Sequence, residues 1–172
     1  MISSSAGAQS SLHPIELGAE TGVSVGLVDS ADKEIHVPVA VRVGVFLGES
    51  QSVEARLSAT KASDGFDYTA YRAEIGFLYH FLGRQRTDIF SSENRRAEAY
   101  VRPFLGRQRI DIPDFNKNED ILGIGLGGKI PLTNALVWRS ELNATHFYRH
   151  HRFDSRGFNV FGALTGLSIL VR

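Results

Sequence analysis

Hydrophobic and polar residues alternate one by one along most of the chain, and the pattern is clearest between Tyr71 and Phe81. The positions in step with Tyr71 are all apolar or aromatic, whereas the intervening positions include Arg72, Glu74 and His80. A period of two is typical of a β-strand whose faces meet different surroundings. The segment exceeds the about 5–6 residues of most strands in soluble domains. It matches the about 9–11 residues of a tilted strand that crosses a bilayer.

Seven further segments repeat this alternation, and no segment favours a helix, because glycines recur at every second position in several of them. The predicted strands are residues 15–27, 37–47, 53–61, 71–81, 97–105, 122–130, 138–146 and 161–171. Consecutive strands joined by turns predict an antiparallel up-and-down meander. An even number of such strands can close on itself and leave no free edge.

The faces opposite the apolar ones carry six acids and six bases in these segments. A barrel of eight strands is too narrow for a water channel, so side chains fill it. Because an unpaired buried charge costs several kcal/mol, the balance predicts that this face points inward and forms a network of ion pairs. The predicted interior charge network consists of Glu16, Glu20, Arg42, Glu54, Arg56, Arg72, Glu74, Glu98, Arg102, Lys129, Arg139 and Glu141.

Aromatic residues lie near the ends of the segments, on or next to the apolar face, as in the interfacial girdles of a transmembrane barrel. The predicted interfacial aromatics are Tyr71, Tyr79, Phe81, Trp138, Phe147 and Phe161. We therefore predict an all-β fold, an eight-stranded antiparallel up-and-down transmembrane β-barrel. The alternative is a soluble, lipocalin-like barrel, which would turn its apolar face inward around an apolar ligand.

Composition narrows the function classes. The chain has 172 residues, which suits one domain, and 19 Lys+Arg balance 19 Asp+Glu. Zero net charge argues against a nucleic-acid-binding protein, and no apolar stretch approaches the roughly 18 residues of a membrane helix. Without cysteine the chain needs no disulfide and has no thiolate metal site.

The first residues differ in character from the rest. Residues 1–13 are small and polar and predict a flexible tail, while residues 14–172 form the predicted barrel domain. Ala6-Gly7-Ala8 has the small-x-small form of a signal-peptidase site, so the tail is alternatively the remnant of a signal region.

Over about residues 14–172, the eight alternating segments make the chain resemble the small outer-membrane β-barrels of Gram-negative bacteria, the OmpA/OmpX-like class. The resemblance implies location in the cell outer membrane, contact with outer-membrane lipid and insertion by the barrel-assembly machinery. We expect a monomer with a side-chain-plugged interior, no cofactor and a structural or interaction role in the envelope.

The connections between strands predict an orientation. Gly48–Gln51 and Pro131–Asn134 are short turns, and Gly106–Asp120 is predicted as the longest polar loop. Short turns belong to the periplasmic side of such barrels and longer loops to the outside, so both termini are predicted to face the periplasm. Gly83–Arg96 does not follow this rule. Pro103 predicts a bulge, because proline cannot donate a ladder hydrogen bond.

Histidines gather at the end of the seventh segment, where His146 and His150 have helical spacing. Because the region is not helical, we predict no metal site. Neighbouring basic residues predict a rim that contacts lipopolysaccharide phosphates. They are Arg149, Arg152 and Arg156.

An enzymatic alternative comes from the resemblance, since some eight-stranded outer-membrane barrels are lipid A deacylases with a His-x-Ser pair on a late strand. Here His146 is followed two residues later by Tyr148, so the nucleophile is missing. We therefore predict no catalytic residues and no enzymatic activity, with a lipid A-modifying enzyme as the lesser alternative.

Overall fold

The computed structural model describes residues 14–27, 35–48, 50–62, 68–82, 97–112, 115–148 and 158–171. These residues form eight strands: β1 (Ile15–Leu27), β2 (Ile35–Phe46), β3 (Gln51–Ala62), β4 (Tyr68–Leu82), β5 (Glu98–Ile112), β6 (Phe115–Pro131), β7 (Leu136–Tyr148) and β8 (Phe158–Val171). In this part of the chain no helix is long and apolar enough to cross a membrane.

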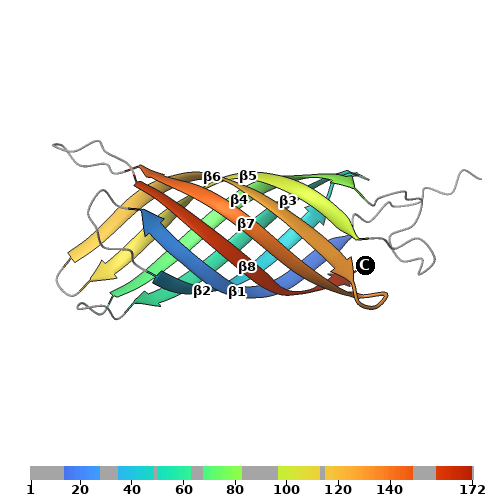
Figure 1. The fold of residues 1–172 in the computed structure, drawn as a ribbon, viewed down its shortest axis with the longest axis horizontal. Coiled ribbons are helices and arrows are strands. Elements are labelled where there is room, and N and C mark those ends of the chain that lie inside the picture. Colours follow the sequence, from blue (N-terminus) through green and yellow to red (C-terminus); the bar gives the residue numbers. More distant parts are fainter. Residues whose placement is uncertain are drawn as a thin grey trace, which may run out of the picture.

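Each strand pairs antiparallel with the next, and β8 pairs with β1, so the sheet closes into a barrel (Figure 1). The closing ladder is continuous from Ile15 opposite Val171 to Leu27 opposite Asn159. The predicted eight-stranded antiparallel up-and-down barrel is therefore confirmed. We call the end that carries Ile15 and Val171 the terminal end, which also holds the β2–β3 and β6–β7 turns, and the other end the opposite end.

The predicted longest loop, Gly106–Asp120, was wrong: β5 continues to Ile112 and β6 begins at Phe115. The two strands form a long hairpin, with Arg107 opposite Asp120. Near the hairpin tip the outward-facing residues are polar. Hydrophobic and polar residues therefore no longer alternate there, although the β-ladder continues. The sequence pattern therefore reported the end of the apolar surface and not the end of the strands.

The bulge predicted at Pro103 was also wrong in position. Pro103 pairs in register with Ile124 of β6. The register shift lies between His80 and Leu82 of β4, opposite another part of β5. A proline removes one donor from the ladder but needs no inserted residue, so the strand passes through it without a shift.

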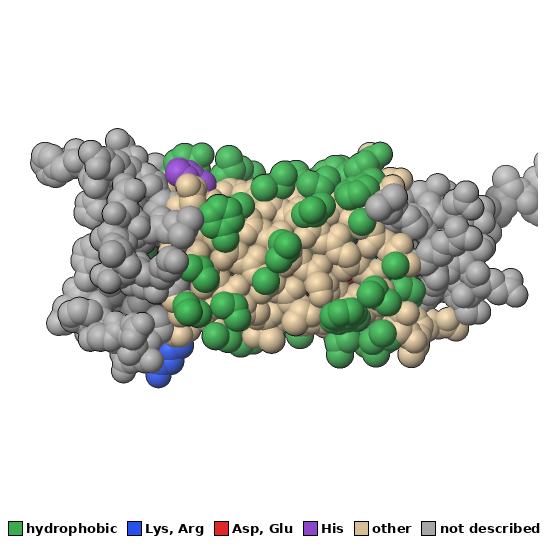
Figure 2. All heavy atoms as spheres, in the orientation of Figure 1, with side chains coloured by type: hydrophobic (Ala, Val, Ile, Leu, Met, Phe, Trp, Pro, Cys, Tyr) green, Lys and Arg blue, Asp and Glu red, His purple; other side chains and the backbone are tan. Residues whose placement is uncertain are grey.

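The outer face of the barrel is apolar over most of its height (Figure 2). Leu57, Ile75 and Leu105 are among its large exposed side chains, with 60%, 59% and 62% of their surface accessible. Charged side chains on the outer face of the described strands are confined to the opposite end. They are Lys61, Arg107, Arg109, Asp111 and Asp120.

Five of the six predicted interfacial aromatics lie on the outer face near strand ends. They are Tyr71, Tyr79, Phe81, Trp138 and Phe161. Phe147 corrects the prediction: it is only 3% exposed and packs inside the barrel with Phe104, Ile121 and Val160. Since β7 runs unbroken from Leu136 to Tyr148, Phe147 is in step with the inward-facing residues. Tyr148, the next residue, is the exposed aromatic of this strand end.

Inward-facing glycines differ sharply in the space around them, which gives a testable prediction. A Cβ added at Gly166 would lie 2.1 Å from the Ala19 carbonyl oxygen and 2.6 Å from the Glu20 Cα, both backbone atoms of β1. At Gly44 the nearest atom, Cβ of Glu16, would be 3.7 Å away. We expect Gly166→Ala to lower the free energy of unfolding by about 1–3 kcal/mol.

Gly44→Ala is the matched control and should leave that free energy unchanged or raise it by less than about 1 kcal/mol. Denaturant titration of both folded barrels makes the comparison. Equal effects of the two substitutions would contradict the packing described for β8 against β1.

Candidate functional site

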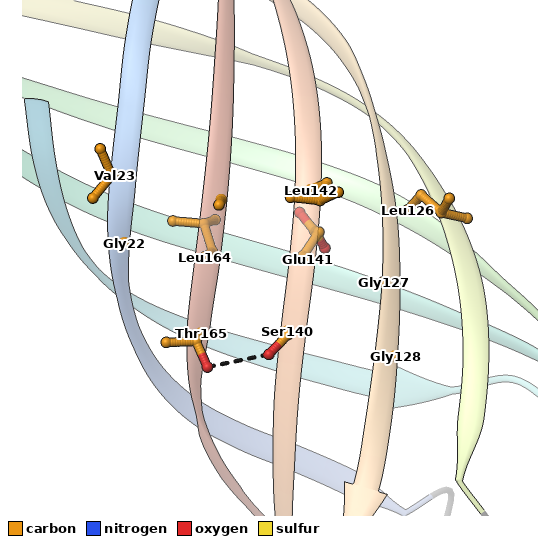
Figure 3. A pocket seen from close by; sticks show the side chains of 11 residues that line it. Gly22, Val23, Leu126, Gly127, Gly128, Ser140, Glu141, Leu142, Leu164 and Thr165 are labelled. Carbon is orange, nitrogen blue, oxygen red and sulfur yellow. Dashed lines mark hydrogen bonds between the residues drawn. The ribbon is translucent and has the colours of Figure 1, made fainter. Parts of the chain in front are cut away.

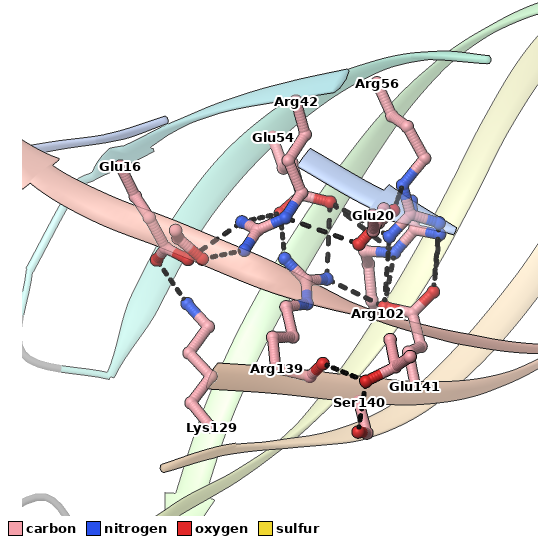
Figure 4. A network of polar contacts seen from close by, with 12 residues as sticks. Glu16, Glu20, Arg42, Glu54, Arg56, Arg102, Lys129, Arg139, Ser140 and Glu141 are labelled. Carbon is pink, nitrogen blue, oxygen red and sulfur yellow. Dashed lines mark hydrogen bonds and ion pairs between the residues drawn. The ribbon is translucent and has the colours of Figure 1, made fainter. Parts of the chain in front are cut away.

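The structure places all twelve residues of the predicted charge network on the inner face of the barrel. Ten of these side chains are almost completely buried, while those of Arg72 and Glu98 are 17% and 19% accessible. Eleven of the twelve join one continuous network, much of it drawn in Figure 4. Glu98 lies next to His80 at the terminal end, and its partner in the β-ladder is Lys129 of the network.

Glu54 and Glu141 occupy the centre of the network, and each is shared by several guanidinium groups. Glu141 Oε1 lies 2.8 Å from Arg102 Nη2, and its Oε2 lies 2.7 Å from Arg139 Nη2. Arg139 also donates to Glu54, whose Oε2 lies 3.2 Å from Arg42 Nη1. These residues come from β2, β3, β5 and β7, so the contacts connect opposite sides of the barrel.

Ion pairs extend from this centre toward both ends. Toward the terminal end, Glu16 lies 2.8 Å from Arg42 and 2.6 Å from Lys129. Toward the opposite end, Arg102 lies 3.0 Å from Glu74, which also contacts Arg72. The ion pairs therefore form one chain of contacts in which bases and acids alternate, in the order Lys129, Glu16, Arg42, Glu20, Arg56, Glu141, Arg102, Glu74 and Arg72.

Tyr100 is a member of the network that the sequence analysis missed. Its side chain is fully buried, and its hydroxyl donates to Glu141 at 2.9 Å and accepts from Arg139. The Arg139 guanidinium also lies 4.6 Å above the ring of Tyr100. The signal was present, because Tyr100 is in step with Glu98 and Arg102, but an aromatic residue does not count in a charge pattern.

A second missed pair is Lys117 with Glu119, whose charged groups lie 2.6 Å apart inside the β5–β6 hairpin. Glu119 is buried, with 1% of its side chain accessible. The pair was hidden by the interpretation of residues 106–120 as a loop. It adds one base and one acid to the predicted six of each, so the inner face of the described strands holds seven bases and seven acids.

Glycines on the inner face make room for the long charged side chains. A Cβ at Gly18 would lie 2.8 Å from the Arg42 guanidinium, and one at Gly125 would lie 2.8 Å from the Glu141 carboxyl carbon. Gly76 stands in the same relation to Arg102, at 2.9 Å. The recurring glycines therefore contribute to the fit of the network, as small residues do opposite large ones in narrow barrels.

The histidine group is only partly within the described residues. His146 lies on the outer face, where its Nδ1 is 2.8 Å from Asn159 Oδ1 and its ring meets the edge of Tyr148 at 4.7 Å. Among the described residues no group of three or more metal-binding side chains occurs. The other residues of this group lie outside the described ranges: His150 and the predicted rim residues Arg149, Arg152 and Arg156.

A hollow of about 520 Å³ lies on the outer face across β1, β8, β7 and β6 (Figure 3). Val23, Leu126 and Leu142 line it, together with the hydroxyls of Ser140 and Thr165, which lie 3.2 Å apart. Thr165 also donates to a backbone carbonyl at 3.3 Å. Because these hydroxyls have partners within the barrel, the hollow suits an apolar occupant.

Comparison with solved structures relates the barrel to known proteins, whereas no protein-family model and no curated protein matches the sequence. Neisserial surface protein A aligns with a TM-score of 0.66 at 11% identity, over 90% of this chain and 96% of its own. The outer membrane protein OprG of Pseudomonas aeruginosa aligns with a TM-score of 0.60 at 8% identity, over 93% and 96%.

The outer membrane enzyme PagL also aligns, with a TM-score of 0.53 at 11% identity, over 88% of this chain and 97% of its own. Since one of the three similar barrels is an enzyme, the shared architecture does not decide whether this chain is one. At these identities the likeness establishes the architecture alone. The chain has the fold of the small eight-stranded outer-membrane β-barrels.

Proposed function

We propose that the chain is an integral β-barrel of the cell outer membrane, with an interior plugged by side chains and a structural or interaction role in the envelope. The observation that carries the proposal is the division of the two faces. The outer face exposes large apolar side chains around the barrel, while the inner face holds a network of paired charges. A barrel in water would need the reverse arrangement.

The height of the apolar surface supports a membrane location. On β4 the outer face runs from Tyr71 to Phe81, both aromatic and about half exposed. Ten residue steps of about 3.3 Å along a strand tilted by about 40° rise roughly 25 Å. This is the height of the lipid-facing band of outer-membrane barrels. Tyr71 and Phe81 would then lie at the two interfaces.

The proposed plug rests on contacts that cross the lumen. Arg56 of β3 lies 3.1 Å from Glu141 of β7, and Arg139 of β7 contacts Glu54 of β3. Such pairs occupy the axis of the barrel with charged groups whose partners are already fixed. We expect purified barrels in a planar lipid bilayer to give no steady ion conductance, and a stable open channel would contradict the plug.

The polar outer face of the opposite end supports an orientation and a lipid partner. The apolar surface ends at Leu105, and the next outward residues of β5 are Arg107 and Arg109. We propose that this end lies at the cell surface, where basic side chains meet the phosphates of lipopolysaccharide. The terminal end would then face the periplasm, and the barrel-assembly machinery would insert the chain as a monomer.

We also propose that the barrel does not modify lipid A. His146 is followed by Phe147, which is buried, and by Tyr148, so the lipid-facing histidine has no serine two residues on. Mass spectrometry of lipid A from cells with and without the protein tests this. Identical acylation is expected, and loss of an acyl chain only in expressing cells would support the enzymatic alternative.

The membrane location itself is tested by the behaviour of the purified chain. We expect it to need detergent or lipid to stay monodisperse, to insert into lipid vesicles, and to migrate differently in gels before and after boiling. A chain that stays soluble and monodisperse in buffer alone would contradict the proposal. It would favour the soluble barrel.

A further inference from the structure

Three inward-facing residues of consecutive strands meet at the terminal end of the barrel interior. Ser52 of β3 lies with its Oγ 3.1 Å from Nε2 of His80 on β4. The other ring nitrogen of His80, Nδ1, lies 3.1 Å from Oε2 of Glu98 on β5. We propose that these residues form a nucleophile, a general base and an orienting carboxylate, and that Ser52 is a reactive serine.

The order of atoms is what nucleophilic catalysis requires. A hydroxyl becomes a nucleophile when a neighbouring base accepts its proton and a third group holds the base in place. The carboxylate beside Nδ1 favours a proton on that nitrogen, so that the unprotonated Nε2 accepts a hydrogen bond from Ser52. The Nδ1 contact is close but is not aligned as a hydrogen bond. Catalytic contacts often tighten only when a substrate is bound.

The surroundings hold the histidine ring in this position. His80 lies between the rings of Phe46 and Tyr100, with 5.9 Å between centroids on each side. Lys129 Nζ lies 5.2 Å and 5.7 Å from the same two rings, which brings a positive charge to this end of the interior. The ring is therefore packed on two sides, and the nearby cation is itself held by Glu16 at 2.6 Å.

The position of the three residues limits the substrate. Ser52 is 3% exposed and faces the interior, so lipids around the barrel cannot reach it. Glu98, with 19% of its side chain accessible, shows that the group lies close to the mouth at the terminal end. We infer that the substrate class is a small carboxylic ester that enters from this end, which goes beyond the proposed envelope role.

The reaction balances without a cofactor. Ser52 Oγ bonds to the ester carbonyl carbon while its proton passes to His80 Nε2. The bond from that carbon to the alcohol oxygen then breaks, and the leaving alcohol takes the proton from His80. Water, deprotonated by the same nitrogen, hydrolyses the acyl-serine, releases the acid and restores the hydroxyl.

Ser168 provides a matched control within the same barrel. It also faces the interior and is 2% exposed, but its hydroxyl contacts the Arg42 guanidinium. A guanidinium stays protonated and cannot accept the serine proton. The two serines are therefore equally buried and differ in the group next to the hydroxyl. Reaction at Ser52 and not at Ser168 would show that His80 activates the serine.

The test is covalent labelling of the folded, detergent-solubilised chain with diisopropyl fluorophosphate, followed by peptide mass spectrometry. Ser52 Oγ displaces fluoride from phosphorus, and the proton passes to His80. We expect an adduct on Ser52 and none on Ser168, a labelling rate at least tenfold lower in Glu98→Gln, and no adduct in His80→Gln. Gel mobility before and after boiling shows whether each variant is folded.

No Ser52 adduct in the folded wild-type barrel would overturn the proposal, as would equal labelling of Ser52 and Ser168. If His80→Gln does not fold, the test rests on Glu98→Gln, which changes one atom of the carboxylate. An unchanged rate of Ser52 labelling in that variant contradicts the roles assigned to the three residues. Labelling is measured in detergent and does not depend on where the barrel resides, so a negative result leaves the proposed envelope role standing.

Discussion

Replacing Arg139 by methionine will lower the free energy of unfolding by about 3–5 kcal/mol, the cost of removing one partner from a buried ion pair. Arg139 contacts Glu54 and Glu141 and is 1% exposed. Without the guanidinium, Glu54 and Glu141 keep ion pairs with Arg42, Arg56 and Arg102, but the inner face of the described strands is left with one acid in excess. Tyr100 also loses the donor to its hydroxyl. Unfolding of the purified barrel by guanidinium chloride measures the decrease in the free energy of unfolding.

Arg109→Met is the matched control, because Arg109 forms an ion pair with Asp111 at 2.6 Å but has 57% of its side chain accessible. A surface pair is worth about 0–1 kcal/mol, so this variant should unfold nearly as the wild type does. Adding Glu54→Gln to Arg139→Met should recover part of the loss, since it removes the excess negative charge that the first substitution leaves. Equal losses for Arg139→Met and Arg109→Met would contradict the buried network.

Replacing Ile75 by arginine will destabilise the barrel in lipid vesicles by about 2–4 kcal/mol, as expected for a charge at the bilayer midplane. Ile75 lies midway between Tyr71 and Phe81 on the outer face of β4 and is 59% exposed. Nothing in the barrel is displaced by a longer side chain there. The cost therefore arises from lipid alone, which makes the substitution a test of the surroundings and not of the packing.

Tyr71→Arg is the control at the same face of the same strand. Because Tyr71 lies near the end of the apolar surface, an arginine there can reach the headgroups, and the expected cost is about 0–1 kcal/mol. In a barrel surrounded by water, both arginines would be solvated and both variants would be as stable as the wild type. If Ile75→Arg lowers the free energy of unfolding by less than about 0.5 kcal/mol, the result falls below the range expected in lipid. It would then favour a barrel surrounded by water.

The alternation of residues was enough to predict the architecture, because the period of two is imposed by strand geometry at every step. The alternation did not identify the strands where outward-facing positions become polar. In the β5–β6 hairpin, Arg107 and Asp120 face outward above the apolar surface, so the pattern resembled a loop although the strands continue. The prediction for Phe147 was wrong because an aromatic side chain near a strand end can face either side, and the alternation along β7 turns this one inward.

The sequence predicted which residues form the charge network but not which of them pair with one another. Six acids and six bases share one face in the sequence, but Arg56 and Glu141 are 85 residues apart and meet across the lumen at 3.1 Å. Such partners depend on the register of all the strands between them. The same holds for Ser52, His80 and Glu98, which come together only because β3, β4 and β5 pair in this particular register.

Fluorescence of Trp138 tests the central claim, that the apolar outer face meets lipid, most directly. It is the only tryptophan in the chain. It lies on the outer face near the terminal end, 42% exposed, and its Nε1 donates to Thr165 at 2.9 Å. In vesicles made with brominated lipids, we predict strong quenching by bromine close to the headgroup and weaker quenching by bromine near the chain ends. Emission typical of water, with no quenching by either lipid, would contradict the account.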